Sequence, residues 1–252
     1  MFRARYAQAT RFKKVIQAVA KVMDEFPFVA TSDGLHVRVL TPDKTTMIIL
    51  EMPTYIFEDF QLDEEKKSFI VSSDDLNRVA KRGARNDFVE LTLDEEGRKL
   101  EINFINQKTG VERKFQVPLR EGIVEELSEP TVDLTVDVEM SASVMKEIIN
   151  DAKLVGDEVE FIGYEDRLEV RVEATQKTYR GVFKIGEGLE FYSIKANPPI
   201  RAKYSIDLLK STLRATSAAD AVKLGFGEAL PMRVNLSLGG GASLIYWVSP
   251  RV

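Results

Sequence analysis

The stretch SDGLHVRV, residues 32–39, decides the fold, because a second version of it, EDRLEVRV, stands at residues 165–172. The two stretches are 133 positions apart. The same offset, without a gap, places Phe28 on Phe161 and carries a further window, residues 72–91, onto the second half of the chain. One constant offset over both windows predicts that the chain is two copies of one domain, and folds built from copies are typically built for geometry.

The composition is that of a folded protein with two domains. The chain has 252 residues, of which 44% are hydrophobic and 30% charged, so each half can form its own core. There is no cysteine, which excludes disulfides and thiolate zinc sites and fits a reducing compartment. No apolar run approaches the roughly 20 residues that span a bilayer, and the first residues lack the apolar core of a signal peptide. We therefore expect a cytoplasmic protein.

Four short stretches carry apolar residues at helical spacing. They are residues 10–23, 73–83, 142–154 and 205–215. Ser72 and Ser73 are both suitable N-caps for the second helix, because a serine hydroxyl can accept a hydrogen bond from a free backbone N–H of the first turn.

Most of the remaining chain alternates apolar and polar residues, which predicts antiparallel strands. Many strands with two short helices in each copy indicate an α+β fold whose helices share one face of the sheets. The alternation is interrupted between Pro118 and Pro130. We therefore predict an N-terminal domain over 1–117, a connector over 118–131 and a C-terminal domain over 132–252.

Positive charge is concentrated in the four predicted helices. The whole chain has a net charge of −5, yet the helices sum to +7 and the rest of the chain to −12. Screening limits electrostatic effects to about 8 Å at physiological salt, so distant acidic surface barely opposes a local basic face. A shared helix face would attract phosphate; the alternative is four ordinary solvated helix faces, and the charge-balanced third helix favours that alternative.

Several segments, in register from end to end, resemble the sliding clamps of DNA replication of the proliferating cell nuclear antigen (PCNA) type. The segments are RFKKVIQAVAKVMDE at 11–25, SDGLHVRVLTPDKTTMIILEMP at 32–53, LSEP at 127–130 and LPMRVNLSLGGGASLIYWVSPRV at 230–252. TPDKT is similar to archaeal members in particular. The resemblance implies a ring of three two-domain chains, with helices lining the hole and sheets outside. Such a ring encircles duplex DNA and serves as a processivity factor in DNA replication and DNA repair.

The resemblance also implies a set of DNA-binding residues on the helices. Sequence-independent contact needs lysine and arginine near phosphates and no base-reading side chains. Asn150 and Asp207 stand where other members often carry a base. By position, the lining candidates are Lys13, Lys14, Lys21, Arg78, Lys81, Lys146, Lys153, Lys210 and Arg214, of which Lys13, Lys14, Lys81 and Arg214 match the family's basic positions best.

A second implied site is a hydrophobic pocket under the connector, which takes a short partner motif with a glutamine and two aromatic residues. DNA polymerase, flap endonuclease, DNA ligase and the clamp loader are the implied partners. Glu129 stands where an apolar residue is common. The corresponding pocket residues here are Leu40, Met47, Leu127, Pro130, Pro231, Trp247, Val248 and Pro250.

The third implied site is the edge-to-edge contact between sibling subunits, roughly Lys108–Val117 of one chain against Gln176–Ile185 of the next. Both edges carry excess positive charge, which is a poor match between identical chains. We therefore hypothesise that the chain prefers a non-identical neighbour, giving a heterotrimer in place of a homotrimer. The charged edge residues are Glu112, Arg113, Lys114, Lys177, Arg180 and Lys184.

Little in the sequence suggests an enzyme. His36 is the single histidine, and without cysteine it supports no nucleophile–base pair. No phosphate-binding glycine loop occurs, and no cofactor or metal is expected. Two alternatives remain: a checkpoint-type clamp subunit that recruits repair or signalling factors, and a metal-dependent nuclease that uses the acidic runs at 63–65 and 94–96.

Overall fold

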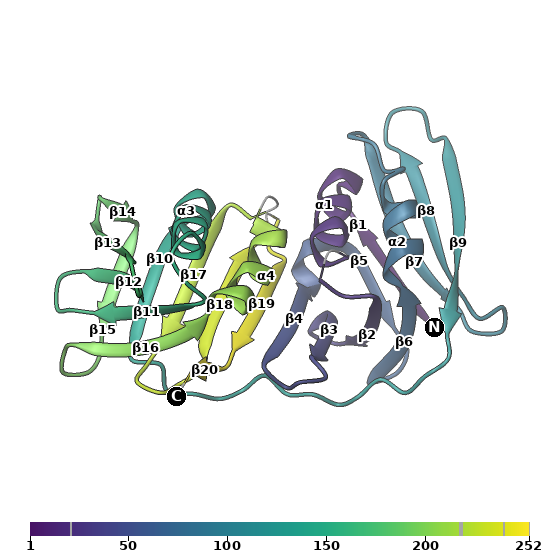
Figure 1. Ribbon diagram of the computed structural model, residues 1–252. Coiled ribbons are helices and arrows are strands. Elements are labelled where there is room, and N and C mark those ends of the chain that lie inside the picture. The colour runs from purple at the N-terminus through teal and green to yellow at the C-terminus, as the bar shows by residue number, and fades with distance from the viewer. Residues whose placement is uncertain (21, 217–218, 239, 252) are drawn as a thin grey trace. The chain divides into compact units, whose positions relative to one another are not determined.

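The computed structural model describes residues 1–20, 22–216, 219–238 and 240–251, with the side chain of Arg214 outside the description (Figure 1). The chain separates into two compact units. The first consists of Met1–Val39, Ile49–Ser128 and Leu238–Leu244, and the second of Leu40–Ile48, Glu129–Ser237 and Ile245–Val252.

The first unit is built on one sheet of mainly antiparallel strands. Across the sheet, the strands lie in the order β4-β3-β2-β6-β9-β8-β7-β1-β5. A short 3-10 helix, η1 (Thr54–Ile56), connects β4 to β5 along the chain. Their bounds are β1 Phe2–Tyr6, β2 Glu25–Thr31, β3 Gly34–Leu40, β4 Thr46–Pro53, β5 Phe57–Leu62, β6 Lys66–Ser72, β7 Asp87–Asp94, β8 Lys99–Asn106 and β9 Glu112–Arg120.

The second unit repeats this plan with two groups of strands. One group has the order β15-β10-β17-β18-β19 and the other β14-β13-β12-β11-β16-β20, and only β13 and β14 pair in parallel among the described registers. The bounds are β10 Val136–Ser141, β11 Glu158–Gly163, β12 Leu168–Ala174, β13 Lys177–Ile185, β14 Gly188–Leu189, β15 Phe191–Ile194, β16 Ile200–Ser205, β17 Ala221–Phe226, β18 Met232–Ser237, β19 Ser243–Val248 and β20 Pro250–Arg251.

Each unit has two α-helices among its described residues, and they pack side by side against its sheets (Figure 1). They are α1 Ala9–Val19, α2 Ser73–Ala80, α3 Ala142–Lys153 and α4 Ile206–Thr216. Of the two predicted caps for α2, Ser72 is the N-cap, and its hydroxyl accepts from the backbone N–H of Asp75 at 3.4 Å. Helix α1 ends at Val19, before the predicted end at residue 23. The prediction was too long because Met23 keeps the apolar spacing and is buried, although it lies beyond the helix.

The predicted duplication is visible in matching contacts. Phe28 and Phe161 are both buried in the cores of their units. The backbone N–H of Ser73, which opens α2, donates to the carbonyl of Asp24 at 2.9 Å, and the N–H of Ile206, which opens α4, donates to the carbonyl of Asp157 at 2.9 Å. The two donors, Ser73 and Ile206, are 133 positions apart, and so are the two acceptors, Asp24 and Asp157. The α+β fold with two similar domains is therefore confirmed.

The strand β9 extends past the predicted domain boundary at 117. It continues through Arg120, and Leu119 and Arg120 pair with β6, so the segment without strand structure begins at Glu121. Pro118 is tolerated because Leu119 directs its own N–H to Arg98, on the β8 side. The position of the missing N–H therefore lies on the opposite side of the strand, where no ladder bond is lost.

Candidate functional site

In the first unit, the predicted DNA-binding residues lie on the outward faces of α1 and α2. Lys14 and Lys81 are exposed and form no ion pair with any described residue, whereas Lys13 is half-buried. Arg78 is exposed but forms an ion pair with Asp75, one turn earlier on the same helix. Phe12, Val15, Ile16 and Val19 fill the opposite face of α1 and fix which way its lysines point. Lys21 lies outside the described residues.

In the second unit, Lys146 on α3 and Lys210 on α4 line one groove of about 550 Å³ between the two helices. Asn150, Asp207 and Ser211 share this groove. The structure thus brings two of the predicted lysines together, alongside an acid that partly offsets them.

Lys153 differs from the other predicted lining residues because it is already paired. Its Nζ lies 2.9 Å from Asp207 Oδ1 on α4 and 3.0 Å from Asp157 Oδ1 beyond the end of α3. The Asp207 carboxylate, followed by that of Asp157, raises the pKa of Lys153, and Lys153 in turn lowers the pKa of Asp207. Sequence spacing did not reveal this pairing, and the expectation of a free lining cation at this position needs correction. The side chain of Arg214 is outside the description.

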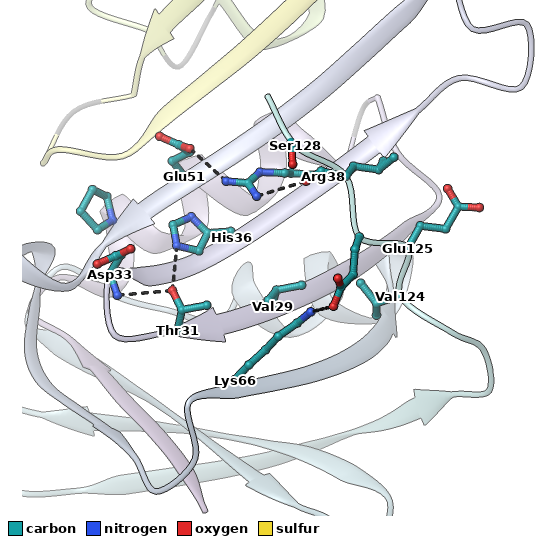
Figure 2. A pocket seen from close by; sticks show the side chains of 13 residues that line it. Val29, Thr31, Asp33, His36, Arg38, Glu51, Lys66, Val124, Glu125 and Ser128 are labelled. Atoms are coloured by element: carbon teal, nitrogen blue, oxygen red, sulfur yellow. Dashed lines mark hydrogen bonds and ion pairs between the residues drawn. The ribbon is translucent and has the colours of Figure 1, made fainter. Parts of the chain in front are cut away.

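A pocket of about 570 Å³ lies on the opposite sheet face of the first unit, beneath the connector (Figure 2). The strands β2, β3 and β4 form its floor, and the segment 124–128 forms its wall. Its lining residues are Val29, Thr31, Asp33, His36, Arg38, Glu51, Pro53, Lys66, Val124, Glu125, Glu126, Leu127 and Ser128.

Two side chains attach the connector to this sheet face. Arg38 Nη1 donates to the carbonyl oxygen of Leu127 at 3.2 Å, and its Nη2 lies 3.8 Å from Glu51 Oε1. Lys66 forms an ion pair with Glu126 (Figure 2). The sequence offered a partial signal for these contacts, since Arg38 and Lys66 are basic residues on strands and the connector is acidic, but it did not distinguish Lys66 from Lys67.

His36 lies in the same pocket, on β3. Its Nε2 is 3.4 Å from the hydroxyl of Thr31, and burial lowers the pKa of the imidazole. Its Nδ1 is buried without a hydrogen-bond partner among the described residues. The arrangement is that of a partly buried histidine on a strand.

The residues predicted for the partner-peptide pocket differ in exposure and in unit. Leu127 belongs to the first unit and the other seven to the second. Within the second unit, Leu40 is 37% exposed, whereas Met47, Trp247 and Val248 are buried. Pro130, Pro231 and Pro250 have intermediate exposure. Within the second unit, the accessible apolar surface of this set is therefore provided by Leu40 and the three prolines.

Glu129, the unusual residue at this site, has two partners within the second unit. Its Oε1 accepts from Arg233 Nε at 2.8 Å and from the indole Nε1 of Trp247 at 3.0 Å. The Arg233 guanidinium also lies 6.0 Å from the centre of the Trp247 ring. A carboxylate among apolar neighbours is tolerated here because it is paired and hydrogen-bonded. Sequence reasoning did not find Arg233, whose only signal was a single basic residue on the strand β18.

Both strands predicted for the subunit contact have unpaired edges in the described part of the chain. Residues 112–118 of β9 pair only with β8, and residues 177–183 of β13 pair only with β12. The edge at β9 begins at Glu112, because Lys108 lies in the preceding turn. Unpaired strand edges are templates for pairing with another chain.

Part of the positive charge counted on these edges is balanced inside the chain. Arg113 forms an ion pair with buried Asp87, and Lys114 Nζ lies 3.3 Å from Glu101 Oε2. Arg180 Nη2 lies 2.7 Å from Glu169 Oε1. The charge counted on the edge strands alone therefore overstates the repulsion between identical chains, because Asp87, Glu101 and Glu169 on other strands supply counter-charges.

The acidic runs considered for metal binding are divided among separate ion pairs. Asp63 pairs with the N-terminal amino group at 2.9 Å, and Lys67 pairs with Glu64 at 3.1 Å and with Glu95 at 2.6 Å. Across the described ranges, no group of three or more His, Asp or Glu side chains is placed to hold a metal ion. No helix in those ranges is long and apolar enough to cross a bilayer.

Comparisons with known proteins agree on one family. The family described as "Proliferating cell nuclear antigen, N-terminal domain" matches residues 1–125. The chain is 30% identical over 252 residues to "DNA polymerase sliding clamp 2" of Sulfurisphaera tokodaii, with all of both chains covered. It is also 30% identical over 245 residues to "DNA polymerase sliding clamp" of Pyrococcus abyssi, covering 97% of this chain and 96% of that one.

Solved structures show the same fold. PCNA of Thermococcus kodakaraensis matches with a TM-score of 0.88 at 22% identity over the whole of both chains. A chain of the PCNA2-PCNA3 complex from Sulfolobus tokodaii matches with a TM-score of 0.81 at 20% identity over 99% of both chains. On the strength of the full-length 30% identity, this chain belongs to the proliferating cell nuclear antigen family of DNA polymerase sliding clamps.

Proposed function

We propose that this chain is one subunit of a ring that encircles duplex DNA and tethers replication and repair proteins to it. The observation that carries the proposal is the pairing of helices in each unit. Each pair turns unpaired lysines outward, Lys14 and Lys81 in the first unit and Lys146 and Lys210 in the second, while apolar faces hold the helices on the sheets. Lysines on rigid elements contact phosphate without reading bases, as sliding requires.

The proposed domain organisation has clamp domains over 1–117 and 132–252, joined by a connector over 118–131. Three such chains would place six similar domains around the DNA. Of the nine predicted lining residues, Lys14, Lys81, Lys146 and Lys210 are the strongest, because each is exposed and none is ion-paired within the described chain. Lys153 contributes least, since two carboxylates already neutralise it.

Sibling clamp chains are the proposed ring partners. The open edges of β9 and β13 support this, because an antiparallel pairing between them would satisfy backbone groups that the chain itself leaves unpaired. The Sulfolobus tokodaii structure is a complex of PCNA2 with PCNA3, two different clamp chains, and this favours a heteromeric ring. Native mass of the chain alone and with sibling chains decides between the two; a stable homotrimer at micromolar concentration would remove the heteromeric preference.

Polymerase, flap endonuclease, ligase and clamp loader are the proposed partners at the hydrophobic pocket. The names of the relatives link the family to DNA polymerase, and Leu40 with the neighbouring prolines offers apolar surface for an aromatic anchor. The role is non-catalytic, as in the clamps to which the chain is related. Such a subunit would act at the nucleoid, associated with DNA.

Retention on circular DNA tests the function directly. The chain, together with its sibling chains, clamp loader and ATP, is loaded onto nicked circular DNA and passed through a sizing column at 0.5 M salt, on the order of the ionic strength that dissociates purely electrostatic contacts. We expect the clamp to co-elute with circular DNA and to be released when a restriction enzyme linearises the circle. Loss from intact circles, or equal retention on linear DNA, would contradict encirclement.

A further inference from the structure

Three arginines of the second unit meet one buried carboxylate on the sheet face that points away from α3 and α4. The Glu169 side chain on β12 is 1% exposed. Arg180 donates to both of its oxygens, Nη2 to Oε1 at 2.7 Å and Nε to Oε2 at 3.2 Å. Arg171 donates from Nη2 and Nε to Oε2 at 2.7 and 3.1 Å, and Arg167 donates from Nε to Oε1 at 3.3 Å.

The cluster keeps positive charge after its internal contacts are made. Hydrogen bonding, from Arg180 first, lowers the pKa of Glu169 to about 2, so this carboxylate is ionised at neutral pH and offsets one guanidinium. Asp166 Oδ1 accepts from Arg167 Nη1 at 2.8 Å and offsets a second. One positive charge therefore remains, shared between Arg171 and Arg180.

Arg171 and Arg180 are also held in a defined orientation with donors to spare. They stand opposite each other in the β12–β13 register, and Glu169 fixes one edge of each guanidinium. The Nη1 groups of both arginines make no hydrogen bond to any described residue, and the Arg180 side chain is 61% exposed. Arginine forks recognise carboxylates in a bidentate manner, and holding them in place beforehand lowers the entropic cost of binding.

The equivalent face of the first unit shows what such a surface holds. Arg38 occupies the position 133 residues before Arg171, and it donates to the carbonyl of Leu127 in the connector. Lys66 on the same face pairs with Glu126 (Figure 2). The segment on this face, residues 124–128 with the sequence VEELS, contains two adjacent glutamates and belongs to no helix or strand. In the first unit, the sheet face beside Arg38 thus binds an acidic segment of polypeptide that is not part of a sheet.

We infer that the outer face of β12 and β13, through Arg171 and Arg180, binds an extended, carboxylate-rich segment of a partner protein. Val182 stands opposite Glu169 and is 42% exposed, which gives the segment an apolar contact between its charged ones. Glu160 and Glu173 also belong to this face. Their negative charges repel nucleic acid, which carries a phosphate at every nucleotide, more strongly than a peptide whose carboxylates are separated by uncharged residues. The surface is distinct from the proposed peptide pocket and from the backbone edge of β13.

Fluorescence anisotropy with a defined probe tests the inference. The probe is a labelled synthetic peptide, EGIVEELSEP, and its control is the same peptide with every Glu replaced by Gln. We expect saturable binding of the acidic peptide and none of the control. Arg180→Lys, which keeps the charge but loses the fork, should weaken the Kd about fivefold, as expected for one solvent-exposed ion-pair contact. Lys195→Gln, which removes an exposed base elsewhere in the unit, is the matched control and should change nothing.

Several results would overturn the inference. Equal weakening by Lys195→Gln would mean that the peptide responds to net charge alone. Tighter binding of a single-stranded 10-mer oligonucleotide than of the peptide, abolished by Arg180→Lys, would assign the face to nucleic acid. A changed native mass of Arg180→Lys with unchanged peptide affinity would assign Arg180 to the subunit contact. Thermal unfolding of each variant confirms that the comparison concerns folded protein, and Arg171→Lys provides a second, independent substitution of the fork.

Discussion

Replacing single lysines on the helix faces should divide them into those that contact DNA and those that are already neutralised. Lys14 is exposed without an ion pair to any described residue, whereas Lys153 lies within 3.0 Å of two carboxylates. A lysine that neutralises a phosphate releases counterions, and each such contact adds about 0.9 to the slope of log K against log salt. A lysine that remains bound to two aspartates adds little to this slope.

The expected magnitudes follow from this difference. Lys14→Gln should reduce the salt slope by about 0.9 for each phosphate that the side chain no longer neutralises. If the variant and the wild type bind equally at 1 M salt, the variant then binds about eightfold more weakly than the wild type at 0.1 M. Lys81→Gln should behave in the same way, because Lys81 is also exposed and unpaired within the described residues. Lys153→Gln should leave the slope nearly unchanged, although the released Asp207 and Asp157 charges lower the affinity itself.

The assay is anisotropy of a labelled linear duplex titrated with the assembled clamp between 50 and 200 mM salt, a range that spans about 10³-fold in affinity for a protein with several phosphate contacts. Thermal unfolding of each variant serves as the folding control. Equal slope changes for Lys14→Gln and Lys153→Gln would refute the argument that ion pairing decides which lysines line the hole. Unchanged slopes for all three variants would show that these faces do not meet DNA.

Three further predictions concern acidic side chains. Asp207→Asn should tighten duplex binding and raise the salt slope, because it frees Lys153 from one partner and removes an acid beside Lys210; the same anisotropy titration measures this, and weaker binding would contradict it. Glu129→Ala should destabilise the second unit by about 1–3 kcal/mol, since Trp247 and Arg233 each lose a hydrogen-bond acceptor. Urea unfolding followed by the fluorescence of Trp247, the single tryptophan, reports it; Glu139→Ala, which removes only an ion pair to Lys223 at 3.4 Å, is the matched control and should cost less than about 1 kcal/mol. Glu169 has its pKa lowered to about 2 in the folded chain, so its stabilising effect is present above the unfolded value near 4.5 and is lost as the pH falls towards 2. Glu169→Gln should therefore lower Tm at pH 7 and flatten its decline between pH 4.5 and 2; an unchanged acid profile would contradict the assignment.

Much of the fold was predictable because its signals are local or repeated. Apolar spacing identified all four helices, and the repeat placed Phe28 and Phe161 at equivalent core positions. Alternation identified most strands, although the predicted start of the connector at Pro118 falls inside β9, since a proline whose missing N–H lies on the unpaired side does not stop a strand. Cationic helix faces were likewise predictable, because helical geometry alone assigns Lys14 to the side opposite Val15 and Ile16.

The pairings between distant residues were not predictable in the same way. The contact between Lys153 and Asp207 depends on how α3 packs beside α4, and nothing in either segment indicates it. The same holds for Glu129 with Arg233 and Trp247, which lie more than 100 positions apart in sequence. Charge counted strand by strand missed the partners of Arg113 and Arg180 for the same reason, because each counter-charge is on another strand.

The bonds that Asp24 accepts from Ser73 and that Asp157 accepts from Ile206 involve main-chain atoms alone. Substitution of side chains leaves such a link intact unless proline takes the donor position. Each half can therefore change its surface chemistry while the framework beneath it persists, and the chain illustrates this where Lys14 in one half corresponds to Glu147 in the other. Gene duplication followed by independent drift of the two surfaces is compatible with one inherited scaffold.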